Sequence, residues 1–546
     1  MRSDASHFDA ALAAMSADEL RRFLREFSRQ LGPAAREHLQ GALMERAARG
    51  PSGWRPSPPP SDVAMQVEQF LDAANKTGAA NPERVDEFLR KGNQAFLAGD
   101  MPAARAILGP LLTAIAEGGF DLGQEETEEE VLMEPLRPCV ARFLVAVYLT
   151  TPLAQRADSL LESLEAVDPV GSLSEPLRDM EQVATAPLPE LDAFLPLWIS
   201  ALRHKHVSGT REWESPGDRR LREAVTRAEG IAGLGRLARA SKQPQALQAW
   251  CTALVERGQW REALHAFEEA ASLVGSEFWR GSFLDGAALA TRELGHGDFT
   301  QRLATAWRAV PSLQRLLRWL EAGDPSATTL KKRATLELAQ PPTRSPLLLG
   351  VLHLVAGGFE SAAHLLATAP GLGWSNAGHP GHVLFPAFAW LLGGAPEGSL
   401  CSELIAPLSC PPGALPGSAA GDSAPLEPAS GDAALHTPAL LTVLERDDLA
   451  RRLTPATQQK LRDTLRQAAW ARAMGVIHEK RRRHYGHAAL LAACCVELDH
   501  AASPGDRADR WVTSLRAETK RYPAFQAALE AALKRARRTP PHRDID

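Results

Sequence analysis

The chain has 546 residues, of which 45% are hydrophobic and 23% are charged, a composition typical of globular proteins. This length exceeds one ordinary hydrophobic core, so several globular units or an array of repeats are expected. The net charge of −5 is too small by itself to indicate a partner. Aromatic residues make up 6% of the chain and Ala and Leu dominate, which favours helix over strand.

The sequence carries no sign of membrane insertion or secretion. No apolar run reaches the roughly 18 residues that cross a bilayer, and no apolar core follows Arg2 as in a secretory signal. The six cysteines lie mostly in apolar runs, which indicates buried thiols rather than a disulfide framework. We therefore expect a cytoplasmic protein with no membrane partner.

Residues 1–48 are predicted to form a small N-terminal helical unit. Ser16 and Glu19 have the spacing of a capping box. Apolar residues then recur at helical spacing, namely Leu20, Phe23, Leu24, Phe27 and Leu31. Four prolines between 56 and 60 exclude helix, so 49–62 is predicted as an extended, semi-rigid linker.

Residues 63–395 are predicted to form an array of antiparallel helix pairs. The clearest pair, at 246–271, places small and large apolar residues at fixed offsets: Gly258, Trp260, Ala263 and Phe267. A second copy has Gly92, Gly99 and Ala104, and another has Gly350, Gly357, Phe359 and Ala362. A degenerate copy at 283–310 has its turn at Gly297, with Ala306 and Ala309 expected to face the partner helix. Such agreement in type and spacing predicts a stacked helical array.

The C-terminal part is expected to differ in character from the array. Residues 396–436 contain a Pro/Gly/Ala-rich stretch that cannot bury enough surface to fold and is predicted to be a loop. Residues 437–546 contain four apolar helical runs and are predicted to form a bundle. From 451 to the end there are 20 Lys and Arg against 10 Asp and Glu, so this bundle is basic.

The motifs of familiar enzymes and metal sites are missing. The sequence contains no P-loop, nucleophile elbow, G-x-G-x-x-G or H-E-x-x-H. His379 and His382 flank Pro380 and Gly381, but zinc would need further paired ligands, so a structural turn around Gly373 and Trp374 is expected instead. In this turn Trp374 should be buried and His379 should bond internally. We expect no catalytic residue, no metal, no cofactor and no small-molecule substrate.

The basic run Lys480, Arg481, Arg482 and Arg483 is the candidate interaction site. Its arginines could neutralise phosphates, which would give salt-dependent binding of nucleic acid. The alternative is an exposed, solvated face, because aromatic residues for base stacking are nearly absent around it.

The repeat residues resemble those of tetratricopeptide repeats. More of the chain is similar to the helical region that follows the zinc finger in bacterial SWIM-finger proteins, through SADEL at 16–20, FWR at 278–280, AVPSL at 309–313, GLGWS at 371–375, HPG at 379–381 and RYPAF at 521–525. A SWIM finger needs C-x-C, which this chain lacks. The resemblance therefore implies the helical scaffold and not the zinc-dependent contact.

Together these patterns predict an all-α, TPR-like α-solenoid with a small N-terminal helical unit and a C-terminal helical bundle. Stacked pairs usually bind an extended or helical peptide. The predicted function is a non-enzymatic protein–protein interaction scaffold, and the alternative is a nucleic-acid-associated accessory protein.

Overall fold

The computed structural model describes residues 9–10, 12–123, 127–128, 131–171, 173–205, 214–393, 398–412, 434–446, 453–502 and 507–536. Within these ranges the protein is all-α, and its one extended contact is an isolated parallel bridge between Ala79 and Asp121. The helical class predicted from composition is confirmed. Of the predicted loop at 396–436, residues 396–397 and 413–433 lie outside the described residues. The loop prediction is wrong for the described part at Leu400–Ile405 and Ala406–Ser409, which is helical.

The chain divides into two compact units, Met1–Ala246 and Leu247–Asp546. The division falls inside the 63–395 segment that the sequence predicts as one array. Helix α12 (Pro244–Glu256) begins just before it.

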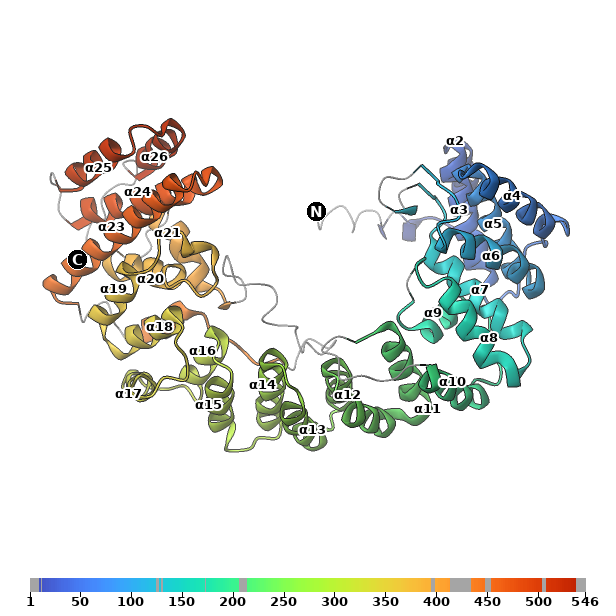
Figure 1. The fold of residues 1–546 in the computed structure, drawn as a ribbon, viewed down its shortest axis with the longest axis horizontal. Helices are drawn as coiled ribbons and strands as arrows, with labels where there is room; N and C mark the ends of the chain where they lie inside the picture. The colour runs from blue at the N-terminus through green and yellow to red at the C-terminus, as the bar shows by residue number, and fades with distance from the viewer. Residues whose placement is uncertain are drawn as a thin grey trace. The chain divides into compact units, whose positions relative to one another are not determined.

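In unit 1, helices α5 to α11 alternate between two layers (Figure 1). Helices α5, α7, α9 and α11 contact one another in order, while α6, α8 and α10 form the second layer. The bounds are α2 (Ala17–Gln30), α3 (Pro33–Ala48), α4 (Val63–Thr77), α5 (Pro82–Ala98), α6 (Met101–Ala116), α7 (Leu136–Thr150), α8 (Leu153–Ala166), α9 (Pro176–Val183), α10 (Leu191–Lys205) and α11 (Pro216–Ser241). Helix α11 is broken at Gly230, where φ is 61° and ψ is −155°.

Local capping explains where these helices begin. Asn81 and Asp100 accept hydrogen bonds from the backbone N–H groups of Glu83 and Ala103, and a proline stands in the first turn of each helix. Both features satisfy or remove N–H groups that a helix start leaves unpaired. Ser16 and Glu19 form the predicted capping box at the start of α2.

In unit 2, α13 to α16 contact their neighbours in order, and α17 to α19 do the same. Helix α23 packs on α19 and α20, so the C-terminal helices join the preceding ones directly. The bounds are α13 (Trp260–Leu273), α14 (Glu277–Glu293), α15 (Phe299–Ala309), α16 (Leu313–Glu321), α17 (Ala327–Ala339), α18 (Pro346–Ala356), α19 (Phe359–Ala367), η2 (Gly373–Ser375), α20 (Gly381–Gly393), α21 (Leu400–Ile405), η3 (Ala406–Ser409), α22 (Leu440–Arg446), α23 (Pro455–His478), η6 (Arg482–His484), α24 (Tyr485–Ala502), α25 (Arg507–Glu518) and α26 (Pro523–Ala536).

Three helix pairs share one turn. Gly99, Gly258 and Gly357 have φ of 87°, 67° and 80°, the left-handed region that favours glycine. In each turn the glycine N–H bonds to the carbonyl three residues earlier, and the next N–H bonds to the carbonyl five residues earlier. These two bonds define the Schellman motif, which satisfies the last carbonyls of the first helix.

Two details differ from the sequence predictions. In the degenerate copy the left-handed residue is Gly295, with φ of 66°, and not Gly297. Ala306 is buried as expected, but Ala309 is exposed because α15 ends there. The predicted linker at 49–62 is free of helix as expected. It packs on α5, where the Gln94 amide donates to the Ser57 carbonyl at 2.7 Å.

Candidate interaction surfaces

The repeat-defining residues hold the helix pairs together. Ala104, Ala263 and Ala362 each follow a turn glycine by five residues, and all three are fully buried. A Cβ on Gly92 would lie 2.5 Å from the Leu108 side chain, so only glycine allows α5 and α6 to approach this closely. These residues therefore serve the packing of the helices and are not exposed to solvent.

The other copies use their large residues in the same way. Phe267 lies against Gly286 of the following helix α14, and Gly350 lies against Leu384 of α20. Phe359 is buried, whereas Trp260 is half-buried.

The basic run Lys480–Arg483 lies in the connection between α23 and α24. Lys480 has φ of 52° and makes the same pair of Schellman bonds as the turn glycines. All four side chains are exposed, and none forms an ion pair with a carboxylate in the described part of the chain. Of the other basic residues near the C-terminus, Arg535 pairs with Glu403. Arg537 and Arg538 lie outside the described residues.

The turn at 371–386 forms around Trp374, which is 7% exposed. Its ring centroid lies 4.9 Å from that of His379, 5.7 Å from that of His382 and 5.1 Å from that of His487. His379 Nε2 lies 3.1 Å from the Pro370 carbonyl oxygen, and Gly381 donates its N–H to His379 Nδ1 at 3.0 Å. These bonds identify Nε2 as the protonated nitrogen. Trp374 is thus buried and His379 internally bonded, as expected from the sequence.

Burial keeps these imidazoles neutral. It lowers the pKa of His379 to about 4 and, together with Arg472, the pKa of His487 to about 4. Burial also lowers the pKa of His382. Arg472 donates to the Gly371 carbonyl at 3.2 Å, and burial lowers its pKa as well. Because burial lowers the pKa values of His379 and His487, the cluster should lose stability on acidification.

Long-range carboxylate caps are a feature that the sequence did not reveal. Glu223 on α11 accepts the backbone N–H groups of Leu177 at 3.1 Å and Arg178 at 2.7 Å, at the start of α9. Glu497 caps α21 in the same way through Leu400 and Cys401. Burial raises the pKa of Glu223 to about 7 although these hydrogen bonds favour its ionised form.

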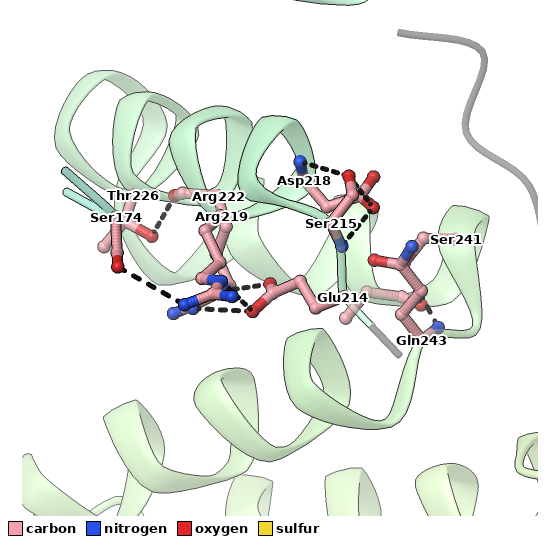
Figure 2. Close-up of polar contacts among 10 residues, drawn as sticks. Ser174, Glu214, Ser215, Asp218, Arg219, Arg222, Thr226, Ser241 and Gln243 are labelled. Atoms are coloured by element: carbon pink, nitrogen blue, oxygen red, sulfur yellow. Dashed lines mark hydrogen bonds and ion pairs between the residues drawn. The ribbon is translucent and has the colours of Figure 1, made fainter. Parts of the chain in front are cut away.

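A second buried carboxylate stands at the start of α11 (Figure 2). Glu214 is 6% exposed at its side chain and accepts two hydrogen bonds from Arg222, at 2.8 and 3.1 Å. Arg219 lies 3.9 Å from Glu214 and donates to Ser174 at 3.3 Å. Ser215 and Asp218 form the capping box of α11 beside them. Through its contacts with Arg219 and Arg222, Glu214 ties the chain just before α11 to the first turns of that helix.

The face of α5 and α7 is covered by α3. Glu37 on α3 lies 3.0 Å from Arg90 on α5, and Glu45 lies 2.8 Å from Arg142 on α7. The proline segment that follows α3 also contacts the helices of unit 1. Its Arg55 donates to Oγ1 of Thr185, just after α9, at 2.9 Å. The acidic residues of α3 are visible in the sequence, but their partners are too distant in the chain to be inferred from it.

A polar cleft of about 700 Å³ lies between α19 and the start of α23, beside the place where the two helices pack together. It is lined by Glu360, His364, Lys460, Thr464 and Gln467 among others. The described residues contain no group of three or more His, Cys, Asp or Glu side chains arranged to hold a metal ion. Among these residues, too, no helix is long and apolar enough to cross a membrane.

Comparison of the sequence with models of known protein families gives no match, and comparison with curated proteins gives none either.

Proposed function

We propose that this protein is a non-enzymatic protein–protein interaction scaffold whose helix pairs form a TPR-like α-solenoid. The observation that supports this proposal is the shared turn and register of three helix pairs. In all three, a left-handed glycine is followed five residues later by a buried alanine and nine residues later by a buried large side chain, Leu108, Phe267 or Leu366. Repeated pairs of this kind generate extended surfaces that bind peptides.

The proposal includes the relationship to the helical region of bacterial SWIM-finger proteins and a cytoplasmic location. All six cysteines are free thiols, and five of them are buried. A reducing compartment maintains that state.

The second candidate is a nucleic-acid-associated accessory protein. The observation that favours it is the exposed run Lys480–Arg483, which lacks ion-pair partners in the described part of the chain. Unpaired arginines can bind phosphates and release counterions, so the affinity would fall steeply with salt.

One experiment separates the two candidates. The tagged full chain and its Arg481→Glu/Arg482→Glu variant are used to capture partners from the native host, with and without nuclease. A defined protein that resists nuclease and binds both chains supports the scaffold. Co-purified nucleic acid that disappears with the variant supports the accessory protein. If neither appears, or if the pure chain turns over a substrate, the scaffold proposal is wrong.

A further inference from the structure

We propose that the face of α5 and α7 beneath α3 is a binding surface for an acidic helical segment of a partner protein, and that α3 occupies this surface until such a partner displaces it. The inference rests on the proposed scaffold function and names the chemistry of its partner. It is drawn from unit 1 alone.

The surface demands a carboxylate. Arg142 is 6% exposed, and a cation so deeply buried needs a paired negative charge. Glu45 supplies that charge at 2.8 Å, while Arg90 lies 3.0 Å from Glu37 of α3 and 3.9 Å from Glu134, which precedes α7. The carboxylates of Glu37 and Glu45 project from one helix, so the surface recognises acidic side chains held in helical geometry.

Helix α3 fits this surface incompletely. Arg142 Nε and the Asn93 side-chain oxygen are buried but have no hydrogen-bond partner among the described residues. A buried polar atom that is left without a hydrogen-bond partner destabilises the packed state. A partner helix that places a further acceptor near Arg142 Nε would bind this surface better than α3 does.

Helix α3 is also held weakly. Of its residues whose burial is described, only Ala48 is buried, and α2 buries none. Arg36 ties the two helices into one hairpin through the carbonyls of Ser28, Arg29 and Leu31. The Arg90–Glu37 pair is partly exposed, and ion pairs that water can reach contribute little to stability. The hairpin can therefore leave as a unit with little loss of apolar burial.

The test adds α3 as a separate peptide and measures its binding to the protein. The probe is a fluorescent synthetic peptide of residues 31–50, and the receptor is the full chain carrying Glu37→Arg and Glu45→Arg, which repel its own α3 from Arg90 and Arg142. Fluorescence anisotropy should show binding to this variant at least about tenfold tighter than to the wild type, where the tethered α3 competes at high effective concentration. The affinity should fall as salt is raised.

Two controls tie the binding to the ion pairs. The peptide carrying the same two substitutions should not bind the variant. Adding Arg90→Glu to the variant should weaken its binding of the natural peptide. The same change should strengthen its binding of a peptide that carries Glu37→Arg. Equal binding to wild type and variant would overturn the proposal, and so would no binding to a variant whose helix content and melting temperature match those of the wild type.

Hydrogen exchange on the wild type gives an independent test if the variant fails to fold. Amides of α3 should exchange at least about tenfold faster than those of α5 and α7. If the amides of α3 exchange as slowly as those of α5 and α7, α3 does not leave the surface and the proposal is contradicted. A host protein that binds the chain without competing with the peptide would refute this surface while leaving the scaffold proposal intact.

Discussion

Acidification should destabilise unit 2 through His379. This side chain is 5% exposed, and burial lowers its pKa from 6.5 to about 4. Between these values the unfolded chain binds a proton that the folded chain excludes, so the free energy of unfolding falls as the pH falls. One such group lowers this free energy by about 2 kcal/mol between pH 7 and pH 5, and by about 3 kcal/mol over the whole window.

Urea denaturation of the wild type and of His379→Gln at both pH values measures this effect. Glutamine keeps a donor and an acceptor for the Pro370 carbonyl and the Gly381 N–H but does not titrate. His382, His487 and Arg472, which surround His379, are present in both proteins and largely cancel in the comparison. The wild type should lose about 2 kcal/mol more than the variant on going from pH 7 to pH 5. Equal losses would show that His379 can accept a proton without penalty and would refute the reasoning.

Four further substitutions test the packing and the turns. Trp374→Ala should lower the free energy of unfolding by about 3–5 kcal/mol, measured by urea denaturation, and an unchanged melting temperature would contradict this. Gly357→Ala should cost about 1 kcal/mol because φ is 80°, although no atom lies within 4 Å of the new methyl group. Gly486→Ala, in ordinary helical backbone with equally open space, should instead stabilise by a few tenths of a kcal/mol. Lys480→Gly should raise the melting temperature by relieving a left-handed lysine, and a decrease would show that its side chain matters more than its backbone.

The local features of this fold could be read from the sequence. The capping box of Ser16 and the turns at Gly99, Gly258 and Gly357 depend on residues within a few positions of one another, and glycine is nearly the only residue that adopts the required backbone. Where two glycines stand close together, as at Gly295 and Gly297, spacing does not decide which takes the positive φ.

Contacts between distant helices could not be predicted. Glu223 caps a helix that begins more than forty residues earlier, and many other glutamates of the chain have the same local surroundings in sequence. The cluster around Trp374 draws His487 from a helix about a hundred residues away. Such pairings depend on how helices pack, which the apolar pattern of each helix leaves open.

The residues that make helix pairs alike are therefore not the residues that would distinguish one partner from another. Ala104, Ala263 and Ala362 are buried, and each occupies the same position in its helix pair. The pair α7–α8 is joined through Thr151 and Pro152 with no left-handed residue, so a pair can form even where the shared pattern is lost. Under the proposed function, specificity for a partner must come from side chains at the rims and faces of the helix pairs, where the charges differ from one pair to the next. In unit 1 the buried Arg142 pairs with Glu45 of α3, so a helix that replaced α3 there would have to supply a carboxylate.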